Sequence, residues 1–246
     1  MSGMKTPDDI VANPFALPTK WRFDNIPKMM EMLKINDTGF WGMLFNSIYF
    51  SVIGAFFSAS CTAMLAYVTC KYKFPGSGAY FIASLITMIL PIYGTGGSMY
   101  LLLDKLGLLN SRLMIITSFS GIGVYYMYFY AFFQNVSNTY AEAARIDGAG
   151  DYTIFFRVMF PQAFPMFGAI FLMIWMAEWN NYSTALLYLN ELPTLSVGIY
   201  LFRTESGGDF DILYMAYFIT CIPPLVIFAF FNNVLMSNVS LGGIKE

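Results

Sequence analysis

Long stretches without a charged residue alternate with short polar segments along this chain of 246 residues. A helix that crosses a lipid bilayer needs about 20 consecutive, mostly apolar residues. Stretches of this kind predict five membrane-spanning helices, near residues 41–68, 80–103, 113–133, 161–187 and 212–235. A membrane β-barrel would instead show short segments of alternating polarity. We therefore expect an all-α integral membrane protein, with one transmembrane helix bundle over residues 39–236.

The two ends of the chain are polar. Residues 1–38 contain no apolar run long enough for a signal peptide. Within them, Ile26, Met29, Met30 and Leu33 recur at helical spacing. This spacing predicts a short amphipathic helix, which we expect to dock on the protein's own surface. Residues 237–246 are expected to form a short tail outside the membrane.

Small residues recur at every fourth position of the first span. They form two parallel rows: Ser51, Ala55, Ala59 and Ala63, and Gly54, Ser58, Thr62 and Ala66. Small side chains at this spacing let helix backbones approach closely in lipid, so this span is expected to have a packing face. Prolines are expected to interrupt two other spans, at Pro91 and at Pro223–Pro224, where a neighbouring helix or a water-filled cavity can satisfy the freed backbone groups.

Composition agrees with a membrane protein and narrows its chemistry. Hydrophobic residues make up 57% and charged residues 11% of the chain, whereas soluble domains carry about 25% charged residues. The net charge of -2 gives no electrostatic basis for binding nucleic acid. The chain has no His, and its three Cys lie far apart without metal-binding or redox spacing. We therefore predict no metal site and no cofactor.

A polar loop, expected over residues 137–160, separates the third and fourth spans. Thr139 followed three residues later by Glu142 predicts a capping box at a helix start. Gly148 is a natural helix stop, and Asp151 or Thr153 can begin a second short helix. The pattern predicts two short helices on the membrane surface, joined by a glycine turn.

This loop resembles a motif of permease subunits from binding-protein-dependent ABC importers. Those subunits carry Glu-Ala-Ala, three residues, Gly, nine residues and Ile-x-Leu-Pro. This chain has Glu142-Ala143-Ala144, then Gly148, then Val158-Met159-Phe160-Pro161 at the same spacing. Val158 and Phe160 replace the usual Ile and Leu but keep the apolar character.

The resemblance implies that the loop holds a cytoplasmic coupling helix, which docks on a separate ATPase subunit. The residues expected to contact the ATPase subunit, or to shape the helix that does so, are Glu142, Ala143, Ala144, Arg145, Asp147 and Gly148. The chain has no G-x-x-x-x-G-K-[ST] motif for binding ATP phosphates. We therefore expect a subunit that is not itself an enzyme, with ATP hydrolysis supplied by the partner.

Further segments are similar to the carbohydrate permeases of the maltose-transporter group. They include the turn at residues 71–76, the Trp179-Asn180-Asn181 sequence, where Asn181 replaces an acid, and the ending at residues 240–245. In that family the subunit usually has six spans and a cytoplasmic N-terminus. We therefore expect either that the native chain begins upstream or that its first span has been lost. Lys and Arg occur on both expected sides of the membrane, so the resemblance alone puts residues 1–38 outside and 237–246 in the cytoplasm.

The end of the fourth span is a candidate for the substrate path. Glu178 lies about 25 Å along a helix that starts at Pro161, at 1.5 Å per residue, and an ionisable residue inside a span is a functional candidate. Trp179, Asn180 and Asn181 follow it and could face a sugar. An interfacial acid beside an aromatic belt remains an open alternative.

The function predicted from the sequence is that of a permease in the cell membrane of a prokaryote, which imports a sugar or another solute by alternating access. The resemblance implies three partners: an ABC ATPase, a second permease and an extracytoplasmic solute-binding protein. An ion-coupled secondary transporter is the alternative, but it would normally carry several acids or bases inside the membrane, and Glu178 alone qualifies. An intramembrane enzyme would need a convergent acid-base or metal set, and none is visible.

Overall fold

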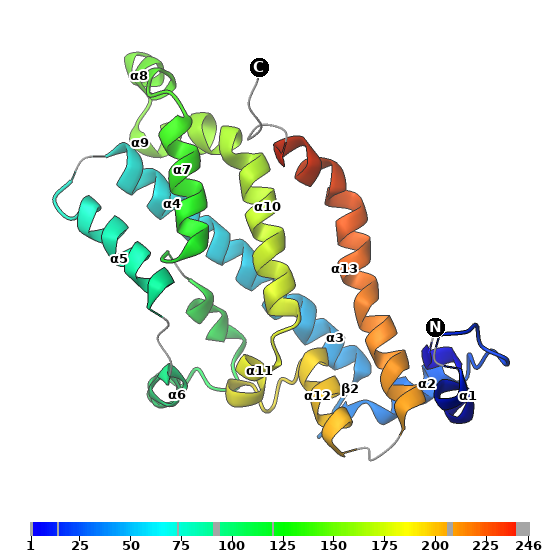
Figure 1. Cartoon of the computed structure of the whole chain (residues 1–246). Helices are drawn as coiled ribbons and strands as arrows, with labels where there is room; N and C mark the ends of the chain where they lie inside the picture. Colours follow the sequence, from blue (N-terminus) through cyan, green and yellow to red (C-terminus); the bar gives the residue numbers. More distant parts are fainter. Residues whose placement is uncertain are drawn as a thin grey trace. The chain divides into compact units, whose positions relative to one another are not determined.

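The computed structural model describes residues 2–13, 15–72, 74–90, 94–119, 121–205 and 209–239, without the side chains of residues 95 and 231–239. These residues are mostly helical (Figure 1), in agreement with the predicted all-α class. The helices, in chain order, are η1 (Ser2–Met4), α1 (Pro7–Ala12), α2 (Asn25–Met32), α3 (Phe40–Ile48), η2 (Tyr49–Ile53), α4 (Gly54–Lys71), α5 (Ser77–Ile89), α6 (Thr95–Lys105), η3 (Arg112–Ser118), α7 (Val124–Asn135), α8 (Thr139–Ile146), α9 (Asp151–Ile154), η4 (Phe155–Met159), α10 (Phe160–Trp179), α11 (Tyr182–Tyr188), α12 (Leu195–Glu205) and α13 (Phe210–Val239). The antiparallel strands β1 (Lys34–Ile35) and β2 (Thr38–Gly39) pair Lys34 with Gly39 and Ile35 with Thr38.

Within the described residues, three helical stretches are long and apolar enough to cross a membrane. They are Phe40–Lys71, Asp151–Trp179 and Phe210–Phe230. The first two each continue through a π-helical turn, η2 and η4 respectively. Asp151 starts a helix, as expected, but the predicted second short helix is not separate from the fourth span, because α9, η4 and α10 follow one another without a break.

The expected second and third spans are not single helices. In the second, α5 ends at Ile89 and α6 begins at Thr95, while Pro91 itself lies outside the described residues. In the third, η3 and α7 are separated by a turn in which Gly123 has φ +107°, a conformation that would cost other residues free energy. The spans near 80–103 and 113–133 therefore stay predictions, each built from two shorter helices.

The fourth and fifth spans also differ from their expected form. The helix expected over 161–187 ends at Trp179, because Asn181 caps a new helix, α11. The helix expected over 212–235 is continuous through Pro223 and Pro224, so this proline pair does not interrupt it. The ending at 240–245 that resembles the family lies outside the described residues.

The chain folds into two compact units. The first comprises Met1–Ser51, Tyr100–Met114 and Met176–Phe230. Its apolar core consists of Leu103, Met114, Ala185, Tyr188, Leu189 and Val197. The predicted amphipathic helix is present as α2, and Met29 and the following Leu33 are buried. Asn46 and Ser47 in α3 bind the start of α12: the Asn46 amide donates to the Pro193 carbonyl at 3.1 Å, and the Ser47 hydroxyl accepts from the Leu195 amide at 2.8 Å.

The second unit comprises Val52–Met99, Ile115–Trp175 and Phe231–Glu246. Its centre is the contact between α4 and α7. The small residues of the first span that belong to this unit are buried, as the packing-face prediction requires: Gly54, Ala55, Ser58, Ala59, Thr62, Ala63 and Ala66. Near the C-terminal end of α4, aromatic side chains complete its contact with α7, and the rings of Tyr67 and Phe133 are 5.4 Å apart.

Candidate functional site

Helix α8 begins one residue earlier than a capping box would require. Asn138 is the N-cap, its backbone is already right-handed helical, and its own side chain makes no capping hydrogen bond. Thr139 is therefore the first helical residue, and its hydroxyl lies 2.8 Å from that of Ser137. The Ser137 hydroxyl also accepts from the Thr139 amide at 3.2 Å. The predicted Thr139–Glu142 capping box is wrong, because Ser137 provides the side-chain oxygen at this end.

Gly148 ends α8 in the way the sequence predicts. Its φ is +82°, and its amide donates to the Arg145 carbonyl at 3.0 Å. The next amide, of Ala149, reaches back to the Ala144 carbonyl at 2.9 Å. These two bonds form a Schellman motif, in which a left-handed residue closes the helix. An added Cβ at Gly148 would meet no atom within 4 Å, so the need for glycine comes from the backbone conformation alone.

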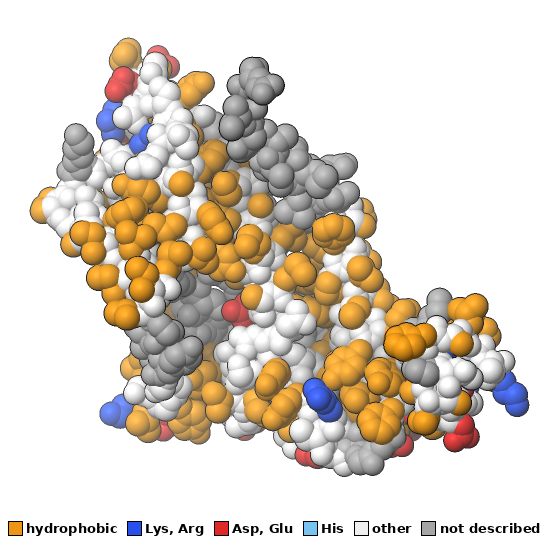
Figure 2. All heavy atoms as spheres, in the orientation of Figure 1, with side chains coloured by type: hydrophobic (Ala, Val, Ile, Leu, Met, Phe, Trp, Pro, Cys, Tyr) orange, Lys and Arg blue, Asp and Glu red, His pale blue; other side chains and the backbone are white. Residues whose placement is uncertain are grey.

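Helix α8 has no buried residue. Glu142, Ala143 and Asp147 are exposed, and Ala144 is half-buried. Two large apolar side chains also face outward, because Tyr140 is 55% and Ile146 87% exposed. Charged side chains gather at the α8 end of the second unit, whereas hydrophobic ones cover α5 and α7 (Figure 2). A polar helix that exposes such apolar residues is a candidate docking surface.

Three side chains join the end of α4 to the segment that follows α8. The hydroxyl of Tyr72 donates to the Asp151 carboxylate at 2.8 Å, and the Arg145 guanidinium donates to the same oxygen at 3.0 Å. Arg145 also lies over the Tyr72 ring, 5.7 Å from its centre. The hydrogen bond to Asp151, and to a smaller extent that to Tyr72, raises the pKa of Arg145 above its usual range.

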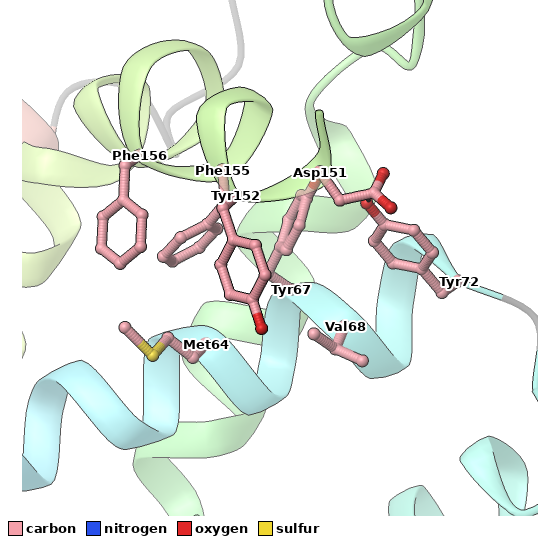
Figure 3. Close-up of a pocket in the computed structure, with 8 residues that line it drawn as sticks. All are labelled: Met64, Tyr67, Val68, Tyr72, Asp151, Tyr152, Phe155 and Phe156. Carbon is pink, nitrogen blue, oxygen red and sulfur yellow. Dashed lines mark hydrogen bonds between the residues drawn. The ribbon is translucent and has the colours of Figure 1, made fainter. Parts of the chain in front are cut away.

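A cavity of about 400 Å³ lies beside this cluster, between α4 and the segment α9–η4. Its lining side chains are labelled in Figure 3: Met64, Tyr67, Val68, Tyr72, Asp151, Tyr152, Phe155 and Phe156. Tyr72 and Asp151 form its polar edge (Figure 3), and the rest of the lining is aromatic or apolar. The rings of Tyr67 and Phe155 are 5.0 Å apart, which binds α4 to η4.

The second candidate, residues 178–181, lies in the first unit at the end of α10. Trp179 is 5% exposed, and its indole N–H donates to the Thr220 carbonyl at 3.2 Å. Asn181 is the N-cap of α11, and its side-chain oxygen accepts from the Thr184 amide at 3.2 Å. Both side chains therefore have structural tasks.

Glu178 and Asn180 are bound less firmly. Glu178 is half-buried, and its carboxylate lies 3.5 Å from the Asn181 amide nitrogen. Asn180 is exposed, and its amide donates to the Met176 carbonyl of its own helix at 2.8 Å. Asn180 and Trp179 line a cavity of about 180 Å³ with Ser196, Tyr200 and Arg203. Polar groups and an aromatic ring thus converge on one cavity.

The structure brings the predicted residues together in two groups, Glu142 to Gly148 on α8 and Glu178 to Asn181 at the α10–α11 corner. Sequence reasoning missed the polar contacts of Tyr72 and Asp151, which were seen only as part of a basic turn and as a helix start. Neither residue stands at a distinctive spacing from α8, and 79 positions separate them from each other. No local pattern in the sequence could have paired them.

Comparison with known proteins gives a consistent result. The profile of the family described as binding-protein-dependent transport system inner membrane component matches residues 59–240. The diacetylchitobiose uptake system permease protein NgcG of Streptomyces coelicolor is 29% identical over 248 residues, covering 98% of this chain and 80% of that protein. The arabinooligosaccharides transport system permease protein AraQ of Halalkalibacterium halodurans is 27% identical over 208 residues, covering 84% and 75%. A chain of a bacterial ABC transporter that imports the acidic polysaccharide alginate has the same fold, with a TM-score of 0.76 and 21% identity over 94% of this chain and 86% of that one.

Proposed function

Since this chain belongs to the family of binding-protein-dependent transport system inner membrane components, we propose that it lines the translocation path of an ATP-driven importer and that α8 couples this path to a separate ATPase. As a member of this family, the chain is a multi-pass membrane permease. The proposal concerns its mechanism, its cargo and the residues that act. It also keeps the expected orientation, with α8 in the cytoplasm.

The observation that carries the proposal is the exposed, glycine-closed helix α8. Its C-terminus is closed by backbone hydrogen bonds, yet none of its residues is buried. Tyr140 and Ile146 therefore offer apolar contact area without disturbing the fold. Glu142 and Asp147 add negative charge on the same short helix. Such a rigid element suits insertion into a cleft of a partner protein, and the motif at Glu142 suggests that this partner is the ATPase.

The proposed transport cycle is alternating access. ATP binding closes two ATPase subunits, which moves α8 and its counterpart on a second permease. The path between the two permeases then switches from inward-open to outward-open, where a solute-binding protein delivers cargo. The cargo proposed is a sugar or oligosaccharide, because the relatives above are named for the uptake of diacetylchitobiose and arabinooligosaccharides. Glu178 and Asn180 are proposed to face this cargo, next to Trp179 and Asn181.

Two threonine substitutions in the same loop test the coupling role of α8. Gly148 has φ +82° and Gly150 has φ -74°, and an added Cβ meets nothing within 4 Å at either position. Threonine is strained at a positive φ, but it serves about as well as glycine at an N-cap, which is the position of Gly150. Gly148→Thr should introduce about 1–2 kcal/mol of backbone strain, which should misdirect α8. Gly150→Thr should introduce no such strain.

Each variant is purified as the whole importer, and three quantities are measured: retained ATPase subunit, ATP hydrolysis stimulated by loaded binding protein, and uptake into proteoliposomes. We expect Gly148→Thr and Glu142→Ala to insert normally but to lose stimulated hydrolysis and uptake, while Gly150→Thr stays normal. If Gly148→Thr and Glu142→Ala both keep all three quantities, α8 is not the coupling element.

A further inference from the structure

We infer that the dipeptide Lys71–Tyr72 at the end of α4 holds both ends of the α8 loop and thereby passes the movement of α8 to the first membrane-spanning helix. This inference rests on the proposed coupling role of α8 and goes beyond it. It names α4 as the helix that receives the movement, and it assigns Lys71, Tyr72 and Asp151 as positioning residues.

The first attachment precedes α8. The ammonium of Lys71 donates to the carbonyl of Val136 at 2.5 Å. Val136 is the C-cap of α7, and α8 begins three residues later at Thr139. Carbonyls at the end of a helix lack partners within that helix, and a lysine there also interacts favourably with the helix dipole. Lys71 therefore fixes the point at which the chain leaves α7 for α8.

The second attachment follows α8. The Tyr72 hydroxyl donates to Asp151, the first residue of α9, at 2.8 Å. Arg145, near the end of α8, donates to the same carboxylate oxygen at 3.0 Å and lies over the Tyr72 ring. A single carboxylate thus joins α4, α8 and α9. Figure 3 shows the Tyr72 hydroxyl directed at the Asp151 carboxylate, at the end of α4.

These attachments matter because no buried residue anchors α8. Its packing contacts are with the neighbouring segments α9 and η4. The chain on either side of it, by contrast, is bonded to two consecutive residues at the end of α4. A force on α8 would therefore act on residues 71 and 72 rather than dissipate in a flexible loop. Asp151 also begins the helical stretch Asp151–Trp179, so the same carboxylate connects α8 to a second span.

Helix α4 is built to transmit such a force. Its buried face consists mostly of small residues, with Ala55, Ala59 and Ala63 fully buried, and the helix packs against α7. Thr69 bonds to the Tyr126 hydroxyl of α7 at 2.7 Å, close to the attachment points. Close-packed interiors are not continuously deformable and respond to a push by shifting as a body. A displacement at residue 72 should therefore move α4 and α7 together.

Conservative substitutions in the whole importer test this inference. Tyr72→Phe removes the hydroxyl but keeps the ring under Arg145, and Asp151→Asn removes the charge that both partners share. Tyr152→Phe is the matched control, because Tyr152 follows Asp151 directly and is 85% exposed. We expect Tyr72→Phe and Asp151→Asn to lower the uptake per ATP hydrolysed several-fold, with normal assembly and basal hydrolysis. Asp151→Glu should recover most of the ratio, and Tyr152→Phe should equal the native subunit.

The ratio of uptake to hydrolysis separates positioning from a general loss of stability, which would lower assembly and both rates together. A normal ratio in both Tyr72→Phe and Asp151→Asn overturns the inference. If Gly148→Thr still abolishes stimulation in that case, the proposed coupling role of α8 stands without the Lys71–Tyr72 attachment. If Gly148→Thr and Glu142→Ala are also normal, the proposed function fails first.

Discussion

The α8 loop (residues 137–150) and the corner at the end of α10 (residues 178–184) carry similar polar residues but use them differently. In the loop, α8 has no buried residue, and the fold holds it through bonds near its ends. In the corner, Trp179 is buried and bonded to Thr220, and Asn181 caps α11.

This difference separates two kinds of polar residue that a sequence motif lists side by side. Side chains that lie exposed on the surface, such as Glu142 and Asn180, form the first group. Side chains that close a helix or fill a core, such as Asn181 and Trp179, already have a task. Substitutions in the first group should affect transport, and those in the second should affect the stability of the subunit.

The largest effect on stability is expected for Trp179→Ala. This substitution removes a side chain that is 5% exposed and leaves the Thr220 carbonyl without its indole donor. Truncation of a buried tryptophan costs about 3–5 kcal/mol. We expect a clear fall in the thermal unfolding temperature of the purified importer in detergent.

The same change at Trp41 is the control, because Trp41 is 67% exposed in α3. Trp41→Ala should shift the unfolding temperature little. A Trp179→Ala subunit with native stability but no uptake would move Trp179 from the structural group to the cargo-facing group.

A smaller effect is expected for Asn181→Ala, because it removes one helix cap. Loss of the side-chain oxygen that accepts from the Thr184 amide costs about 1 kcal/mol. Asn181→Ser keeps a capping oxygen and should recover most of the stability, as measured by the same thermal unfolding. Equal stability of the Ala and Ser variants would mean that the cap contributes nothing, and Asn181 would then be open to a role in the path.

Much of the fold follows from the sequence alone. The all-α class was predicted from uncharged stretches, the packing face of α4 from its small residues, and the end of α8 from Gly148. Each rests on a local signal: hydropathy, four-residue spacing, or a glycine whose φ no other residue adopts cheaply. Family membership was predicted from the fixed spacing between Glu142 and Pro161.

Other features depend on contacts that local signals do not contain. The capping box failed because Ser137, two residues before Thr139, supplies the oxygen instead. The fourth span ends earlier than predicted because the Asn181 side chain accepts a hydrogen bond from the Thr184 amide and so caps a new helix. The link from Tyr72 to Asp151 joins residues 79 positions apart. Such pairings depend on how the helices pack in three dimensions, which a local sequence pattern does not specify.

The smallest effect on stability, and the sharpest test of the comparison, is expected for Glu178→Gln and Asn180→Ala. Asn180 is exposed and bonds only within its own helix turn among the described contacts, and Glu178 makes one long contact of 3.5 Å. A substitution at an exposed residue such as Asn180 usually changes stability by less than about 0.5 kcal/mol, and Glu178→Gln keeps the size of a half-buried side chain. Unfolding temperature and ATPase retention should therefore match the native importer.

Uptake should nevertheless fall in both variants, because both side chains are proposed to face the cargo, where a lost hydrogen bond weakens binding. Uptake measured over a range of cargo concentrations checks this, with Asn190→Ala as the control, since Asn190 is exposed and lies outside the corner. Native uptake in both variants, beside a native control, would assign Glu178 to the membrane interface and leave the α8 loop as the main candidate for a functional region.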